Sequence, residues 1–193
     1  MKNYRRLIAA ALTLTVTLLM ACTTSAGQAP TKEVRGRIVR VTDGDSVTLL
    51  DTDNTRIKIR LSGIDAPESR MPYGQAAQAH LAGLVLNKEV VAVVHKLDRY
   101  GRTVATLWIG SKDINLTMVQ AGMAWHYKLY AHEQPQNQAL NYAQSELIAR
   151  TESRGLWQHE NAAPPWMWRK SQIQPVRAAN HAKTLMLTEQ NGF

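Results

Sequence analysis

The sequence predicts an α+β fold that is rich in β-structure, with five short strands and about three helices. Three segments rich in β-branched residues follow one another within residues 34–61 and are separated by turn residues. Apolar residues in 73–87 repeat every three or four positions, which indicates an amphipathic helix. The chain has 193 residues, of which 45% are hydrophobic and 20% charged, enough for one domain with its own core.

Turn residues separate the predicted strands. Asp43-Gly44-Asp45 is a strong turn signal, and Asp53-Asn54 is typical of a hairpin turn. The loop at residues 97–102 separates two later β-rich segments. The five strands are therefore expected at residues 34–41, 46–51, 55–61, 88–96 and 103–109.

The predicted helices lie after the third strand and after the fifth. The first covers 73–87, and a short one at 115–122 ends at Gly122. Five short strands with a helix after the third are typical of a small closed barrel of the OB type with helical additions. A longer helix is expected at 136–150, with its apolar face formed by Leu140, Ala143, Leu147 and Ile148.

Residues 1–22 have the layout of an export signal, because three basic residues precede an apolar run from Leu7 to Ala21. That run is shorter than the about 20 apolar residues that a transmembrane helix needs. Its end, Leu19-Met20-Ala21-Cys22, resembles a bacterial lipobox, in which the cysteine is acylated after cleavage. The alternative is ordinary secretion with cleavage near Ala26. The expected location is therefore the cell envelope, as a periplasm-facing lipoprotein, or outside the cell.

The remaining chain is expected to have three parts. Residues 23–33 are small and polar and form a flexible linker, 34–160 form the domain, and 161–193 form an irregular tail that contains tryptophan. Cys22 is the only cysteine, so no disulfide can form within one chain. The net charge of +8 favours a polyanionic partner, either nucleic acid or an acidic membrane surface. A monomer is expected.

Two aspartates are predicted to meet at one edge of the sheet. Asp45 precedes the second strand and Asp65 follows the third. Because strands joined by a hairpin are antiparallel, the start of one lies beside the end of the other. Paired carboxylates without nearby cysteine or histidine favour a hard cation such as calcium or magnesium. The alternative is that the two residues belong only to a turn and a loop.

Two arginines and a glutamate extend this cluster. Arg60 stands between apolar neighbours in a strand, where an unpaired charge is costly and a phosphate would be a suitable partner. Arg102 follows a glycine at the start of the fifth strand. Glu68 lies on the loop after Asp65, where a carboxylate could take a proton from a water molecule.

Three segments resemble the signature blocks of the staphylococcal nuclease family, in the same order. They are Asp43-Gly44-Asp45-Ser46, residues 60–68 (Arg-Leu-Ser-Gly-Ile-Asp-Ala-Pro-Glu) and Asp98-Arg99-Tyr100-Gly101-Arg102, and the resemblance covers residues 34–157. It implies an OB-type barrel with three helices and calcium-dependent cleavage of DNA and RNA.

The resemblance also implies roles for individual residues. Asp45, Asp65 and the main-chain carbonyl of Ala66 are similar to the ligands of one calcium ion. Glu68 resembles the carboxylate assigned as general base or as the group that holds the attacking water. Arg60 and Arg102 are similar to the pair that binds the phosphate and neutralises charge in the transition state.

Aromatic and basic residues near the site are candidate substrate contacts. Arg99 and Tyr100 lie in the tight loop, and Tyr127 and Tyr130 lie in a strip that could stack on bases. The alternative for this strip is that it covers the barrel edge against the last helix. The sequence thus predicts an exported calcium-dependent nuclease of little sequence specificity. The other possibility is a catalytically weak nucleic-acid-binding or envelope interaction module on the same barrel.

Overall fold

The computed structural model describes residues 32–172. The strands are β1 (Lys32–Asp43), β2 (Ser46–Asp51), β3 (Arg56–Leu61), β4 (Ile64–Asp65), β5 (Glu89–Leu97), β6 (Thr103–Ile109), β7 (Lys112–Asp113) and β8 (Trp125–His126). The helices are α2 (Gly74–Val85), α3 (Ile114–Gln120) and α4 (Gln136–Thr151), with the 3-10 helices η1 (Lys128–Glu133) and η2 (Gly155–Gln158). The predicted signal peptide, Cys22 and most of the predicted linker lie outside the described residues. The first strand begins at Lys32, two residues before the predicted start of the domain.

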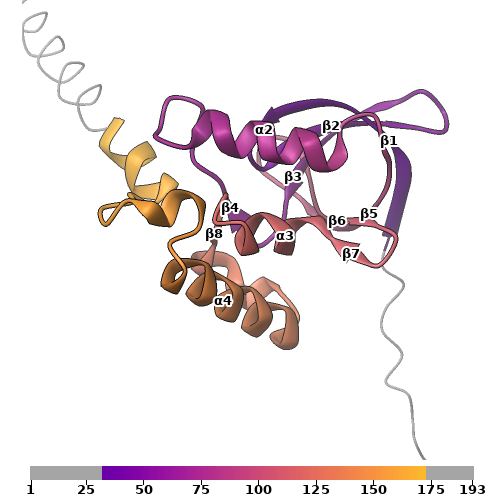
Figure 1. Cartoon of the computed structure of the whole chain (residues 1–193). Helices are drawn as coiled ribbons and strands as arrows, with labels where there is room; N and C mark the ends of the chain where they lie inside the picture. The colour runs from indigo at the N-terminus through magenta and orange to yellow at the C-terminus, as the bar shows by residue number, and fades with distance from the viewer. Residues whose placement is uncertain (1–31, 173–193) are drawn as a thin grey trace, which may run out of the picture. The chain divides into compact units, whose positions relative to one another are not determined.

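Five strands close into the predicted barrel (Figure 1). They pair in the order β3-β2-β1-β5-β6 through antiparallel ladders. A parallel pairing of β3 with β6, which places Ile59 opposite Thr103 and Leu61 opposite Ala105, joins the two ends of the sheet. The predicted fold class, a β-rich α+β barrel with helices, is therefore confirmed.

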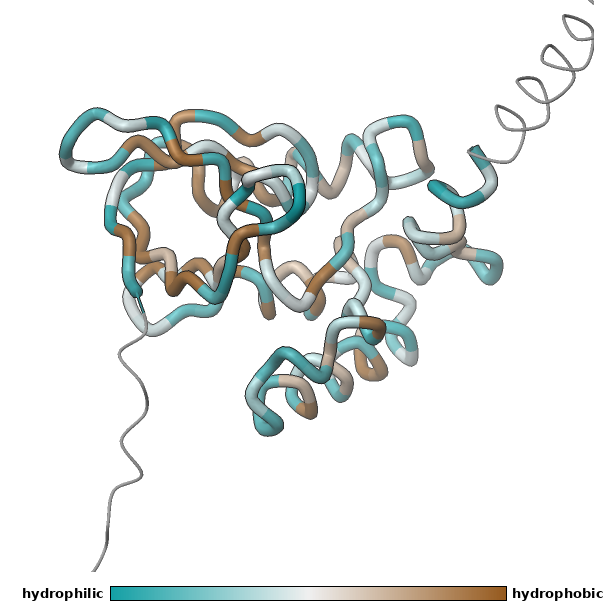
Figure 2. Tube along the Cα trace, turned by 180° about the vertical axis from the view of Figure 1, so that it is seen from behind, coloured by the Kyte–Doolittle hydropathy of each residue, from teal (hydrophilic) through white to brown (hydrophobic). Residues whose placement is uncertain are grey.

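The first strand contributes to two ladders. Its beginning pairs with β5, and the part from Gly36 onward pairs with β2. Its ladder with β2 has two register shifts, one between Ile38 and Arg40 and one between Val41 and Asp43. Such irregularities bend a strand and increase its twist, as closure of a small barrel requires. Hydrophobic and hydrophilic residues both occur along the wall of the barrel (Figure 2), and in β3 (Arg-Ile-Lys-Ile-Arg-Leu) they alternate strictly.

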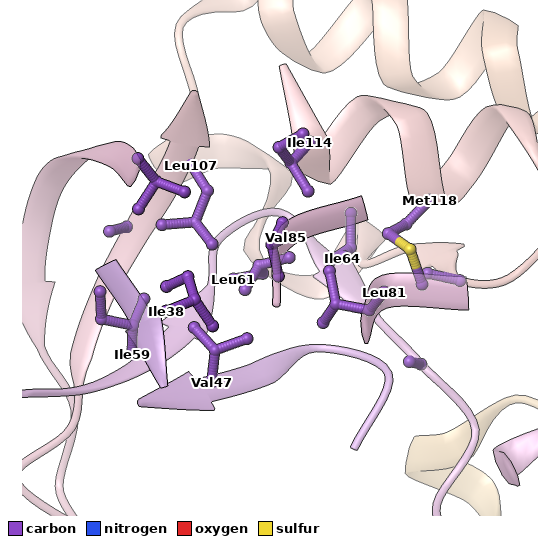
Figure 3. Packing of buried hydrophobic residues seen from close by; sticks show 14 of the residues in the cluster. Ile38, Val47, Ile59, Leu61, Ile64, Leu81, Val85, Leu107, Ile114 and Met118 are labelled. Atoms are coloured by element: carbon purple, nitrogen blue, oxygen red, sulfur yellow. The ribbon is translucent and has the colours of Figure 1, made fainter. Parts of the chain in front are cut away.

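The core fills the barrel and continues beneath α2 (Figure 3). This helix presents Ala77, Leu81 and Val85, each fully buried, to the apolar residues of the strands. Their spacing of four residues places them on one face of the helix, as the sequence predicts. Leu61 and Ile64, which flank the turn after β3, belong to the same cluster.

The turn before β2 depends on a glycine because the chain there lies close to its neighbours. A Cβ atom on Gly44 would lie 2.6 Å from the Cβ atom of Ala66 and 2.7 Å from that of Ala77. No real side chain tolerates such distances without movement of the backbone, so the glycine permits this close packing. The packing fixes the position of Asp45, the next residue.

Helix α4 forms as predicted, but the predicted apolar face is wrong. Leu140 and Leu147 are each 63% exposed, and Ile148 is 44% exposed. The buried residues are Tyr142, Ser145, Glu146 and Ala149, which have the same three-and-four spacing on the other side of the helix.

Polar contacts explain the orientation of α4. The hydroxyl group of Tyr142 donates to Asp113 Oδ2 at 2.8 Å. The backbone N–H of His126 donates to Glu146 Oε1 at 3.3 Å, and Lys128 forms an ion pair with the same carboxylate. Buried polar groups must be hydrogen-bonded, so these partners determine which side of the helix packs against α3 and β8.

The tail is not wholly irregular, contrary to the prediction for 161–193. Residues 165–172 are helical, and Pro165, at the first helical position, fits the preference of proline for helix starts. The rest of the tail, 173–193, lies outside the described residues. Between residues 32 and 172, no helix is long and apolar enough to cross a bilayer.

Candidate active site

Asp45 lies directly before β2, and its side chain is fixed by local hydrogen bonds. The residue is 2% exposed. Its Oδ1 accepts a hydrogen bond from Ser46 Oγ at 3.0 Å, and its Oδ2 accepts one from the backbone N–H of Ala66 at 2.8 Å. Its main-chain carbonyl accepts from the N–H of Leu61 at 2.8 Å. These bonds tie the carboxylate to the segment that carries the other candidate residues.

Asp65 and Arg60 come from the segment that leaves β3. Asp65 is the second residue of β4, is 0% exposed, and pairs with Trp125 of β8. Arg60 lies between Ile59 and Leu61, which are each 1% exposed inside the barrel. Because side chains alternate along a strand, Arg60 points to the outer side of the barrel wall.

The guanidinium group of Arg60 contacts both aspartates. It is 2.6 Å from Asp65 Oδ1 and also forms an ion pair with Asp45 Oδ1. The spacing of these residues in the sequence predicts their convergence, and the structure brings all three together. Two carboxylates so close to each other need positive charge nearby, and Arg60 supplies part of it.

Glu68 joins the cluster through an arginine that sequence reasoning missed. Arg169, in the helical segment 165–172, is 2.7 Å from Glu68 Oε1. Its Nη1 and Nη2 also donate to the two carboxylate oxygens of Asp65, at 3.2 Å and 2.8 Å. Burial alone would lower the pKa of Arg169, but the hydrogen bonds and charges of Asp65 and Glu68 outweigh it and raise that pKa above its ordinary value.

The sequence before Arg169 contains a signal for a helix. Pro164-Pro165 precedes Trp166 and Arg169, and proline favours the first turn of a helix. Residues three apart share one face of a helix, so such a helix places Trp166 and Arg169 side by side. Nothing in the local pattern, however, indicated that this helix would lie against β4.

The structure does not bring Arg102 into contact with the two aspartates. Its Nε donates to Asp98 Oδ2 at 2.7 Å, and its backbone N–H donates to Asp98 Oδ1 at 2.9 Å. Burial raises the pKa of Asp98, but the hydrogen bonds from Arg102 and Tyr100 outweigh this effect and lower it. In the parallel pairing of β3 with β6, Arg60 is opposite Val104. Arg102 is two residues before Val104, so its backbone lies about 7 Å along the chain from the position opposite Arg60.

Arg99 and Tyr100, the other two candidate residues of the loop, also make no contact with the cluster of Asp45, Asp65 and Glu68 in the described part of the chain. Tyr100 is 68% exposed. The guanidinium carbon of Arg99 is 4.9 Å from the centre of the Tyr100 ring, and that of Arg102 is 5.5 Å from it. The loop thus presents an aromatic ring and two guanidinium groups together near the start of β6.

Of the two candidate tyrosines, Tyr127 lies beside Asp65 and Tyr130 packs against Tyr127. Tyr127 donates its backbone N–H to the carbonyl of Gly63 at 2.9 Å, which places it next to the segment that carries Asp65. Burial and the negative charge of Asp65 raise the pKa of Tyr127. Its ring stacks on Trp166 with centroids 5.4 Å apart and meets Tyr130 edge-on at 4.9 Å. Tyr130 is 41% exposed.

The donor set fits a hard cation. Asp45 and Asp65 offer carboxylate oxygens, and the carbonyl of Ala66 adds a neutral oxygen on the same segment. Calcium prefers such oxygen ligands. The three carboxylates of the cluster share two arginines, which leaves one negative charge uncompensated among them. Within residues 32–172 no group of three or more histidine, cysteine, aspartate and glutamate side chains is arranged to hold a metal.

Comparisons with known proteins find similarity to nucleases. The family model described as staphylococcal nuclease homologue matches residues 58–159. The chain is 37% identical over 168 residues to a Haemophilus influenzae protein named as an uncharacterized endonuclease, covering 87% of both chains. It is 37% identical over 148 residues to the micrococcal nuclease of Shigella flexneri, covering 72% of this chain and 82% of that one. It is 40% identical over 116 residues to a staphylococcal-like nuclease of Arabidopsis thaliana, covering 60% of this chain and 34% of the relative.

Proposed function

The chain belongs to the staphylococcal nuclease family, and from this premise we propose that it is a calcium-dependent nuclease that cleaves both DNA and RNA with little sequence preference. It is a phosphodiester hydrolase, as the names of its relatives indicate. The observation that carries the proposal is the contact of Arg60 with both Asp45 and Asp65 at one edge of the barrel.

Three groups are proposed to hold one calcium ion. Asp45 and Asp65 would each supply a carboxylate oxygen, and Ala66 its main-chain carbonyl. Both carboxylates are almost completely buried and held by local contacts, and the ion would share their oxygens with Arg60 and Arg169. A bound calcium ion acts as a Lewis acid that stabilises negative charge on phosphate oxygens.

The charged side chains around this position are proposed to perform the remaining chemistry. Arg60 binds the scissile phosphate and neutralises charge that builds on its oxygens in the transition state. Arg102 does the same from the start of β6, after exchange of its contact with Asp98 for one with the substrate. Glu68 holds the attacking water and accepts its proton.

The substrate outside the scissile phosphate is proposed to contact aromatic and basic side chains. Tyr100 and Tyr130 are exposed enough to stack on bases, and Arg99 adds positive charge beside Tyr100. Tyr127 would contribute where Trp166 does not cover its ring. Contacts to phosphate and stacking carry little sequence information, which supports cleavage without strong sequence preference.

A cleavage assay tests the proposal directly. Plasmid DNA, single-stranded DNA and RNA are incubated with the protein in calcium or in chelator, and products are separated on gels. Cleavage of all three that requires calcium supports the proposal. Binding of nucleic acid without cleavage in calcium would instead support a binding module on the same barrel.

Variants connect this activity to the residues. Arg60→Ala and Arg102→Ala are each expected to lose at least about 10²–10³-fold in rate, the typical effect of removing one donor to the transition-state charge. Arg56→Ala, at the exposed start of the same strand as Arg60, is the matched control and should retain activity. Near-native activity of either site variant would remove that arginine from the mechanism.

Export is proposed on the sequence of residues 1–22 alone, with Cys22 as the site of acylation and of membrane attachment. Labelling of cells with a radioactive fatty acid tests it, because the wild-type protein should incorporate label and Cys22→Ser should not. Unlabelled wild-type protein in the culture medium would favour ordinary secretion.

A further inference from the structure

The guanidinium group of Arg169 connects two residues of the proposed site. It donates to both carboxylate oxygens of Asp65, at 3.2 Å and 2.8 Å, and is 2.7 Å from Glu68 Oε1. Paired donors on a planar carboxylate fix the orientation of both groups, which a single contact does not. Arg169 is therefore a rigid link between the buried Asp65 and the partly exposed Glu68.

Glu68 has little else to hold its side chain. It lies on the loop between β4 and α2, and its side chain is 39% exposed. Its backbone is held by a turn, since its carbonyl accepts from the N–H of Met71 at 2.7 Å. Within residues 32–172, the hydrogen bond and ion pair of its carboxylate are both with Arg169. A glutamate side chain has several freely rotating bonds, so its position depends on this partner.

The helical segment that carries Arg169, in contrast, is held in place by aromatic packing. Trp166, one helical turn earlier, stacks on Tyr127 and meets Trp125 edge-on with ring centroids 5.5 Å apart. Trp125 is opposite Asp65 in the small β4–β8 sheet. The helical segment 165–172 is thus attached beside the same pair of strands that carries Asp65.

We propose that Arg169 is a positioning residue of the nuclease site, which holds the carboxylate of Glu68 at a fixed place relative to Asp65. It acts through Glu68 and makes no contact with the substrate. This assignment rests on the proposed function, in which Glu68 holds the attacking water. Displacement of a catalytic group by about 1 Å can lower the rate by about 10²-fold.

A double-mutant cycle tests the proposal. The rate constant kcat and KM are measured in calcium for the wild type, Arg169→Ala, Glu68→Ala and the double variant. Arg169→Ala should lower kcat by about 10–100-fold and change KM by less than about threefold. In the Glu68→Ala background the same substitution should lower kcat by less than about threefold, because the residue it positions is absent.

Two further variants sharpen the cycle. Arg169→Lys keeps the charge but loses the paired donors, so its kcat should lie between those of the wild type and Arg169→Ala. Lys170→Ala removes a neighbouring charge from an exposed position and should leave kcat unchanged. If Arg169→Ala does not fold, as judged by circular dichroism, Arg169→Gln replaces it in the cycle.

Three results would overturn the proposal. Equal kcat losses in the two backgrounds would show that Arg169 acts independently of Glu68. A raised KM with unchanged kcat would make Arg169 a substrate-binding residue. Higher activity of Arg169→Ala than of the wild type would show that Arg169 competes with calcium or the substrate for the site.

A readout without calcium separates this inference from the proposed function. If the wild type does not cleave nucleic acid in calcium, the proposed function fails. Thermal unfolding of the same four proteins in chelator still tests the contact, because the Tm changes of Arg169→Ala and Glu68→Ala should be non-additive. Additive Tm changes would refute the contact itself.

Discussion

Arg60→Ala should destabilise the protein, and calcium should reverse part of the loss. The substitution removes the guanidinium group between Asp45 and Asp65, which are 2% and 0% exposed. Removing one partner of a buried ion pair typically costs about 3–5 kcal/mol, because a buried charge loses its compensation.

The contacts that remain after the substitution set the expected magnitude. Asp65 keeps its two hydrogen bonds with Arg169, and Asp45 keeps those with Ser46 and the N–H of Ala66. The loss in chelator should therefore lie at the lower end of the range, about 3 kcal/mol. A domain of this size has about 5–15 kcal/mol of stability, so the variant should still fold.

Calcium should reduce this loss because it supplies positive charge to the same two carboxylates. The free energy of unfolding is measured by urea titration, followed by tryptophan fluorescence, for the wild type and the variant in chelator and in saturating calcium. The difference between the two proteins should be smaller in calcium by at least about 1 kcal/mol.

The matched control is Arg56→Ala, which removes an exposed arginine from the same strand. It should change the stability by less than about 0.5 kcal/mol in either condition. A loss for Arg60→Ala of less than about 1 kcal/mol in chelator would refute the ion-pair reasoning. The same loss in chelator and in calcium would refute the proposed metal position.

Three other predictions concern the frame that holds the site. Asn115→Ala removes hydrogen bonds to the backbone of Ser62, Leu107 and Ala105, at 2.9, 3.1 and 3.2 Å. The free energy of unfolding, measured by urea titration, should fall by about 3 kcal/mol. A fall of less than about 1 kcal/mol would contradict the contribution of these three bonds. Burial lowers the pKa of His126 below 6.5, so the unfolded chain binds a proton that the folded chain does not, and stability falls as the pH drops below 6.5. His126→Gln should flatten the fall in unfolding free energy at acid pH, and an unchanged slope would contradict this. Leu81→Ala in the core should lower the free energy of unfolding by about 2–5 kcal/mol. Leu147→Gln on the exposed face of α4 should change it by less than about 0.5 kcal/mol. Similar losses of stability for the two variants would contradict the observed burial.

The barrel strands were predictable because their signals are local. Each segment of β-branched residues is bounded by turn residues such as Gly44 and Asn54, and the strands begin and end within two residues of their predicted positions. The pairing that closes the barrel was not predictable at that level. Ile59 and Thr103 are 44 positions apart, and nothing near either residue indicates the other as its partner.

The α4 error shows where an apolar pattern misleads. Leu140 and Leu147 have helical spacing, and so have Tyr142, Glu146 and Ala149 on the other side. Hydrophobicity favours the leucines, but the buried side is the one whose polar groups have partners on β7, β8 and η1. Those partners belong to segments distant in the sequence, so the pattern of one helix could not reveal them.

The site also has a part that the sequence predicts and a part that it does not. Asp45, Asp65 and Arg60 converge through antiparallel strand geometry that short spacing determines. Arg169 is 104 residues from Asp65 and contacts it only because the helical segment 165–172 packs beside β8. Its contribution depends on tertiary packing, which no pattern within the segment encodes.

The parallel pairing of β3 with β6 has a consequence for the order of folding. Strand pairs that are distant in the chain form slowly, because closing a long loop costs entropy before any contact compensates. Until this pair forms, the segment with Arg102 is not beside the segment with Arg60, although both strands already have their hairpin partners. During refolding, hydrolysis of nucleic acid should therefore recover after the far-ultraviolet circular dichroism signal, since activity reports the last closure of the barrel.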